Sequence, residues 1–287
     1  MIAPMAGYSI RYSLWYQGER NTQENTGEAL YSCYFGAMIE QWRRAWGIGD
    51  YAFVFAQLAP DVTTQNFTSV RMAQADNRAQ KGGVMSTTGM AVTIDLGDRE
   101  SPYGSVHSRN KTEVGRRLAL QAIWAQRSIL PPYNNYSGPF PLGAAQQSGN
   151  TIVVKIDPAT LYGKPAAFYG TGECTTCCEG AVDLFQMTND PKGASGWLDA
   201  TVYSLDGSGN IVLQAPSSTT NYSYVRFSAT NYPECAIRNG EGIAMSPFVQ
   251  AIGSTANELQ ASITSRREAH RAAIRAANAP SSGNKKI

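Results

Sequence analysis

The sequence has few charged residues, few histidines and no long apolar run. Charged residues make up 16% of its 287 residues, the formal net charge is +2, and basic residues cluster only near the C-terminus. Nucleic-acid-binding domains carry a basic patch or stripe, so this composition argues against that class. No apolar run approaches the roughly 20 residues that a bilayer crossing needs. We therefore expect neither a nucleic-acid partner nor a membrane span.

Signals for the cellular compartment point in two directions. The first eight residues lack the basic start and the long apolar centre of a signal peptide, which taken alone favours the cytosol. Four N-x-S/T sequons, which matter only in the secretory pathway, favour the opposite; they begin at Asn66, Asn110, Asn135 and Asn221. The alternative is that these four sequons occur by chance. On balance we expect a secreted glycoprotein.

The five cysteines are unevenly placed. Cys174, Cys177, Cys178 and Cys235 lie in the second half of the chain, without a neighbouring histidine or a second C-x-x-C pair. Disulfides are therefore favoured over a metal site, with reduced core thiols as the alternative. The adjacent Cys177 and Cys178 are poorly placed to bridge each other, and Cys235 is one possible partner. Cys33, on a predicted helix, is expected to be a buried thiol.

Strands and helices alternate through the first 130 residues. Near-continuous apolar runs bounded by turn residues predict strands, and apolar residues at helical spacing predict helices. The predicted strands are Ser9–Tyr16, Tyr51–Leu58 and Ala91–Ile94, and the predicted helices are Gly27–Trp46, Phe67–Arg78 and a segment from Asn110 to about Arg127. This alternation predicts an α/β fold with a parallel sheet, built by right-handed crossovers.

The second half of the chain differs from the first in composition and in the pattern of its predicted elements. Prolines and glycines between residues 131 and 150 predict a linker, and short strands separated by turns follow. These strands are Thr151–Ile156, Ala166–Tyr169, Ala181–Met187, Trp197–Leu205, Ile211–Leu213 and Tyr222–Ser228, with a hairpin turn at Asp206–Asn210. The spacing is typical of an antiparallel β-sandwich. We expect an α/β domain at 1–130, a linker at 131–150, a β-sandwich at 151–253, and at 254–287 a basic helix (Ser254–Ala277) with a disordered tail.

Candidate catalytic residues gather after the third predicted strand. There Asp95, Asp98 and Glu100 precede His107, and the other histidine of the chain, His270, lies in the charged tail. A histidine that acts as general base needs an acceptor for its second ring N–H. Asp98 is the preferred acceptor, Asp95 and Glu100 are alternatives, and each of these groups could instead be a solvated loop residue.

A second set of candidates follows the first predicted strand. Gln17, Glu19 and Asn21 come directly after it, beside a glycine that allows a sharp turn. A side-chain amide aimed at a developing oxyanion stabilises a tetrahedral intermediate, so Gln17 is a candidate for that role. Glu19 and Asn21 could hold the loop in shape, and the alternative for Gln17 is a turn residue that bonds only its own loop.

Three sequence motifs carry a resemblance to a known family. They are W-Y-Q-G-E-R-N at 15–21, D-L-G-D-R-E-S-P-Y-G-S-V-H-S-R-N-K at 95–111 and V-G-R-R-L-A-L at 114–120. Together they resemble the sialate O-acetylesterase family of SGNH hydrolases, and the resemblance extends over most of residues 1–252. It implies a serine esterase that removes O-acetyl groups from sialic acids or related sugars without a metal or organic cofactor. It also implies a partial three-layer α/β/α sheet followed by the β domain, and a secreted or lysosomal location.

The resemblance assigns roles and leaves one gap. It places the general base on His107 and an oxyanion contact on Gln17. The acid that many SGNH enzymes carry three residues before the histidine is replaced by Gly104, and Ser108 stands where proline is common. The G-Q-S-N-like block that bears the nucleophilic serine is not found, and Ser101 and Ser105 do not sit on a strand-to-helix elbow.

The sequence therefore predicts the C-terminal part of a carbohydrate O-acetyl esterase. Its substrate would be an O-acetylated sugar or sialic acid, and its serine would come from an N-terminal part outside this chain. We expect the chain alone to be inactive on esters and poorly soluble, because an incomplete sheet exposes an edge. The alternative is a catalytically inert glycan-binding or interaction module that uses the aromatic residues of the β domain.

Overall fold

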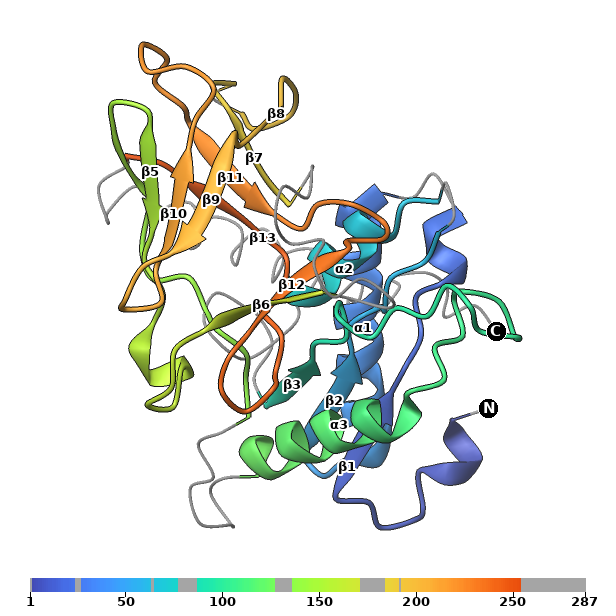
Figure 1. Cartoon of the computed structure of the whole chain (residues 1–287). Helices are drawn as coiled ribbons and strands as arrows, with labels where there is room; N and C mark the ends of the chain where they lie inside the picture. Colours follow the sequence, from blue (N-terminus) through green and yellow to red (C-terminus); the bar gives the residue numbers. More distant parts are fainter. Residues whose placement is uncertain are drawn as a thin grey trace, which may run out of the picture.

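The chain folds into an α/β unit and a β domain that pack side by side (Figure 1). The computed structural model describes residues 2–23, 27–62, 65–76, 87–126, 136–170, 184–190 and 192–253. The predicted tail helix at 254–277 and three of the clustered cysteines, Cys174, Cys177 and Cys178, lie outside these residues. The mixed α/β fold expected from the sequence, a parallel sheet followed by antiparallel sheets, is confirmed.

A three-stranded parallel sheet forms the centre of the α/β unit. Its strands are β1 (Tyr12–Trp15), β2 (Ala52–Ala56) and β3 (Thr88–Ala91), in the order β1-β2-β3. Both pairs are parallel. Every residue of the central strand β2 is buried. A continuous apolar run is expected for a strand that is covered on both faces, and this run is how the sequence predicted β2.

Helices cover both faces of this sheet. Helices α1 (Gly27–Trp46) and α2 (Phe67–Asp76) pack on one face, where Phe35 meets Phe53 and Phe55 at ring-centroid distances of 6.1 and 4.9 Å. Helix α3 (Lys111–Ala125) packs on the other face, against β2 and β3. No helix among the described residues is long and apolar enough to cross a membrane.

The third strand lies earlier in the chain than predicted. The sequence pattern placed it at Ala91–Ile94, but residues 92–94 are buried without belonging to a strand, and the pairing with β2 runs from Thr88 to Ala91. The polar side chain of Thr88 is fully buried. After the strand the chain turns at once, since the N–H of Leu96 donates to the carbonyl of Thr93 at 3.0 Å. The apolar run therefore indicated correctly that residues 92–94 are buried, but these residues do not form a strand.

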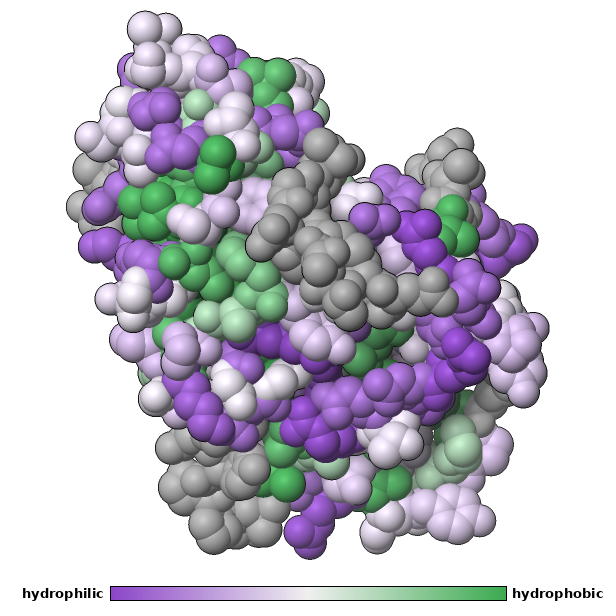
Figure 2. Space-filling model, in the orientation of Figure 1, coloured by the Kyte–Doolittle hydropathy of each residue, from purple (hydrophilic) through white to green (hydrophobic). Residues whose placement is uncertain are grey.

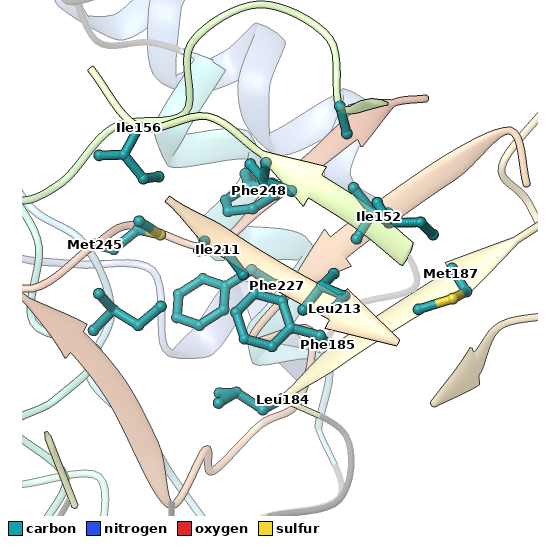
Figure 3. Close-up of a cluster of buried hydrophobic side chains, with 14 of the residues drawn as sticks. Ile152, Ile156, Leu184, Phe185, Met187, Ile211, Leu213, Phe227, Met245 and Phe248 are labelled. Carbon is teal, nitrogen blue, oxygen red and sulfur yellow. The ribbon is translucent and has the colours of Figure 1, made fainter. Parts of the chain in front are cut away.

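The β domain contains two four-stranded antiparallel sheets and one strand pair. Their orders are β4 (Gln146–Ser148)-β5 (Thr151–Val154)-β10 (Ile211–Gln214)-β9 (Val202–Leu205), then β13 (Phe248–Ala251)-β11 (Tyr224–Phe227)-β7 (Phe185–Thr188)-β8 (Leu198–Asp199), and β12 (Cys235–Arg238)-β6 (Ala167–Gly170). Side chains from the two larger sheets share one core (Figure 3); it includes Ile152, Ile211 and Leu213 from one and Phe185, Met187 and Phe227 from the other.

Two details of the β domain differ from the sequence prediction. The single strand predicted at Trp197–Leu205 is divided, because Ala200 donates its N–H to Phe185 in one sheet and Thr201 donates to Gln214 in the other. Strands β4, β12 and β13 were not predicted. The hairpin at Asp206–Asn210 is confirmed by the antiparallel pairing of β9 with β10.

The strand pair β12–β6 lies between the sandwich and the α/β unit (Figure 1). Ala236 of β12 and Ala244 beyond it are fully buried in the core formed by α1, α2 and the parallel sheet. The outward face of α3 is hydrophilic (Figure 2). The β domain thus contributes to the hydrophobic core of the α/β unit at its junction.

Candidate active site

The loops that follow the three parallel strands meet at one edge of the sheet. The strands end at Trp15, Ala56 and Ala91, and each continues into a polar loop. Ligand and catalytic sites of open α/β sheets lie outside the carboxyl ends of the strands. The predicted site residues Gln17, Asp98 and His107 all belong to these loops.

Gln17 lies in a loop that two helices hold in place. Its backbone carbonyl accepts hydrogen bonds from the hydroxyl of Tyr31 on α1 at 3.2 Å and from Nε2 of Gln74 on α2 at 3.1 Å. Its side-chain Nε2 donates to Oδ1 of Asn21 at 2.7 Å. Gly18 has φ +142°, and a Cβ there would lie 3.1 Å from the Tyr31 hydroxyl, so this tight turn requires glycine. The half-buried amide of Gln17 is therefore fixed in direction.

Consecutive turns shape the loop that carries His107. Hydrogen bonds run from the N–H of Ser101 to Asp98, of Gly104 to Ser101, and of His107 to Gly104, at 3.3, 3.0 and 2.8 Å. Gly104 has φ +90°, a conformation that favours glycine. The Ser101 hydroxyl also donates to the His107 carbonyl at 2.6 Å. The backbone at His107 is thus held on both its N–H and its carbonyl.

The side chain of His107 is exposed and lines an open depression. The depression has a volume of about 590 Å³ and is lined by Tyr103, His107, Ser108, Arg109 and Lys111. Lys111 Nζ lies 5.0 Å from the centre of the Tyr16 ring, a cation–π distance that links this depression to the residue before Gln17. Burial raises the pKa of Tyr16 to about 12, so its hydroxyl stays protonated at neutral pH.

Asp98 stands at the start of the histidine loop and binds Arg109. Its carboxylate accepts hydrogen bonds from Arg109 Nε at 2.7 Å, from Nη2 at 2.8 Å and from the backbone N–H at 3.0 Å. These bonds hold the pKa of Asp98 below its ordinary value. Among the described residues, no hydrogen bond joins Asp98 to the imidazole of His107. The role of Asp98 as the acceptor for His107 stays a prediction.

The two alternative carboxylates have different surroundings. The side chain of Asp95 is fully buried and bonds two arginines, with Arg117 Nη2 at 2.8 Å and Arg238 Nε at 2.5 Å. Glu100 is exposed. Asp95 therefore joins the α/β unit to β12, because Arg238 belongs to that strand.

Comparison with known proteins places this site inside a matched segment. Residues 3–123 match the family described as carbohydrate esterase, sialic acid-specific acetylesterase. Curated relatives named sialate O-acetylesterase, from Homo sapiens and Pongo abelii, are 36% identical over 156 residues, which is 49% of this chain and 28% of each relative. The Mus musculus relative is 36% identical over 155 residues. The family resemblance predicted from the motifs is thereby confirmed for residues 3–123.

A solved structure extends the match beyond this segment. A carbohydrate acetylesterase from Xanthomonas citri superposes with a TM-score of 0.67 and 26% identity, over 86% of this chain and 52% of that one. The match therefore includes part of the β domain. In every one of these comparisons the chain spans well under two thirds of its relative, and less than a third of each curated relative.

The structure adds residues to the site that sequence reasoning missed. Asp61, which is 8% exposed, follows β2 and accepts a hydrogen bond from the hydroxyl of Ser105 in the histidine loop. Lys111 and Tyr16 connect the histidine loop to the Gln17 loop. A carboxylate just past a strand end was the signal that selected Asp95 and Asp98, and the same signal applies to Asp61.

Proposed function

We propose that this chain is part of a carbohydrate esterase that removes acetyl groups from sugar hydroxyls, with sialic acids as the preferred substrates. The observation that carries the proposal is the position of His107, exposed in an open depression within the segment that matches the esterase family. The Gln17 loop lies in the same matched segment and follows β1, which belongs to the same parallel sheet as β3, the strand before the histidine loop.

In the proposed reaction His107 acts as the general base. It takes the proton of a serine hydroxyl while the serine oxygen bonds to the acetyl carbonyl carbon, and the amide of Gln17 donates to the resulting oxyanion. The bond from carbon to the sugar oxygen then breaks, and the imidazolium returns the proton to that oxygen. Water repeats the sequence on the acetyl-enzyme and releases acetate.

The proposed acidic partner of His107 is Asp98. Its carboxylate is held by Arg109, so this role requires that Arg109 turns away when the site is assembled. Catalytic hydrogen bonds often tighten only in the complex with substrate, which makes such a rearrangement reasonable. Replacement of Asp98 with Asn in the active enzyme should then lower kcat more than it changes KM.

The nucleophilic serine is proposed to come from a segment that this sequence does not include. The sequence contains no G-Q-S-N-like block. Two serines of the histidine loop have other partners, since Ser101 bonds the His107 carbonyl and Ser105 bonds Asp61. The Oγ of Ser108 is buried. None of these described hydroxyls is placed as a free nucleophile beside the imidazole.

Two assays test this proposal. Residues 1–287 alone should not hydrolyse p-nitrophenyl acetate, and turnover that disappears in His107→Ala would show that the chain holds its own nucleophile. The longest reading frame that contains the sequence should release acetate from O-acetylated N-acetylneuraminic acid faster than from an acetylated xylo-oligosaccharide. The reverse preference would leave the esterase proposal standing and contradict the choice of sialic acids.

We also propose that the protein passes through the secretory pathway. Three of its four sequon asparagines, Asn66, Asn110 and Asn221, lie in the described residues, and all three are exposed. Cys235 is fully buried, and its pairing with one of the cysteines at 174, 177 or 178 stays a prediction. Peptide mapping without reduction, with and without glycosidase treatment, checks both points.

A further inference from the structure

The loop that carries His107 is attached to the rest of the molecule through a buried carboxylate. Asp61 follows β2 and is 8% exposed. Its carboxylate accepts a hydrogen bond from the hydroxyl of Ser105, which lies two residues before His107. Asp61 and Ser105 are 44 residues apart in sequence, so this bond joins two of the three loops at the sheet edge. It is a side-chain bond that holds the histidine loop from another loop, whereas the turns and the Ser101 hydroxyl bind only within the histidine loop.

The β domain in turn holds Asp61. The backbone N–H of Asp61 donates to the carbonyl of Asn231 at 3.2 Å, and Nη2 of the fully buried Arg71 donates to the same carbonyl at 2.7 Å. Arg71 also donates to the carbonyls of Leu58, Ala59 and Thr230 at 2.9, 3.1 and 2.8 Å. Burial lowers the pKa of Arg71 to about 9, and the negative charge of Asp61 opposes that change. Arg71 and Asp61 therefore bind the same β-domain segment.

The next residue of that segment contacts the histidine loop itself. The guanidinium carbon of Arg99 lies 4.4 Å from the centre of the Tyr232 ring. A Cβ added to Gly97 would lie 2.8 Å from the same ring, so the loop and the ring are in close contact. The β domain thus reaches the histidine loop through Asn231, by way of Asp61, and directly through Tyr232.

We propose that Asp61 is a positioning residue for His107, which it holds through Ser105, and that residues 230–232 of the β domain hold Asp61 in turn. This inference rests on the proposed function for its catalytic consequence. Its structural part, the attachment of the loop, stands independently of hydrolysis. The β domain would then be a part of the catalytic unit, in contrast to a module that is merely linked to it.

Hydrogen–deuterium exchange of the 287-residue chain tests the structural part. Ser105→Ala removes the bond while leaving Asp61 beside Arg71, whereas Ser105→Thr keeps a hydroxyl. We expect amide exchange in residues 101–109 to become about 2- to 12-fold faster in Ser105→Ala, the range that the net worth of one hydrogen bond gives. Ser105→Thr should exchange like the parent chain. Asp61→Ala should reproduce the Ser105→Ala change in this loop.

A matched control exists in the β domain. The hydroxyl of Ser195 donates to Asp190 at 3.2 Å in another exposed loop, so Ser195→Ala removes the same kind of bond at a distance from the site. It should leave exchange in residues 101–109 unchanged. Unchanged exchange there in Ser105→Ala would overturn the proposal. So would an equal increase across the whole α/β unit, which would indicate general destabilisation.

The catalytic part is tested in the longest reading frame. Ser105→Ala should lower kcat for acetate release by about tenfold to a hundredfold, the cost of misplacing a reactive group, with little change in KM. Full kcat despite faster loop exchange would overturn the positioning role. An absence of hydrolysis by the unaltered polypeptide would contradict the proposed function, and the exchange result would still decide whether Asp61 holds the loop.

Discussion

Replacement of Asp95 with Ala should destabilise the protein strongly. The Asp95 side chain is fully buried and accepts hydrogen bonds from Arg117, which is 2% exposed, and from Arg238 of the β domain. Arg117 also donates to the carbonyls of Val92 and Gly242 at 2.7 and 3.0 Å. Burial acts to lower the pKa of Arg117, but the carboxylates of Asp95 and Glu113 outweigh it and raise that pKa. Without Asp95, two cations lose a buried counter-charge.

The size of the effect follows from the burial of the group. Removal of one partner from a buried ion pair costs about 3–5 kcal/mol, a large share of the roughly 5–15 kcal/mol by which a protein is stable. For a protein of this size each kcal/mol lowers Tm by about 2–4 °C, so the loss corresponds to about 6–20 °C. An exposed pair should behave differently. Arg99 and Glu234 are about half exposed, at 50% and 52%, and Glu234→Ala should cost at most about 1 kcal/mol.

Urea unfolding of Asp95→Ala, Arg117→Met and the double variant measures this directly. We expect the double variant to be less destabilised than the sum of the two single variants, by about 0.5–3 kcal/mol, because the second replacement removes a charge that the first leaves unpaired. Glu234→Ala provides the comparison with an exposed pair. If Asp95→Ala costs no more than Glu234→Ala, the reasoning from burial is wrong.

Three further predictions concern stability and solubility. Partial burial acts to raise the pKa of Glu113, but two arginines outweigh it and hold that pKa at about 2. The stability that ionised Glu113 contributes is therefore fully present above about pH 4.5 and is lost as pH falls through about 2. Urea midpoints of Glu113→Gln and the parent chain should therefore converge on acidification; a constant gap would contradict this. Gly97→Ala should lower Tm, since its Cβ would meet the Tyr232 ring at 2.8 Å, and an unchanged Tm would show that the ring moves freely. Leu14 on β1 is 53% exposed, so Leu14→Lys should raise soluble yield, and an equal yield would count against an apolar edge as the cause of poor solubility.

Much of the α/β unit was predictable because its helices and strands are marked by apolar spacing and end residues that lie close together in the sequence. The stripe of apolar residues and the glycine after it gave α1 with the bounds Gly27–Trp46 that the structure shows. The predicted start of α3 at Asn110 was likewise correct, since Asn110 caps the helix and its side chain accepts the N–H of Glu113. Strand β3 was predicted too late in the chain because its first two residues, Thr88 and Gly89, are polar and small and so carry no apolar signal, although both are buried.

The candidate site was predictable in part for the same reason. His107 follows a strand and precedes a helix cap, an order that can be read along the chain. The bond from Ser105 to Asp61 joins residues 44 positions apart, and no periodicity encodes such a pairing. Asp98 was selected because it precedes His107 in the same loop and could fold back towards it, yet its carboxylate binds Arg109, which lies at the other end of the loop.

The central claim is that His107 is the base of an acetyl esterase. The most direct test is the rate of acetate release from O-acetylated N-acetylneuraminic acid by the longest reading frame, compared between the parent, His107→Ala and His270→Ala. The account predicts a loss of about 10²- to 10⁴-fold for His107→Ala and no change for His270→Ala. Equal rates for the parent and His107→Ala would contradict it.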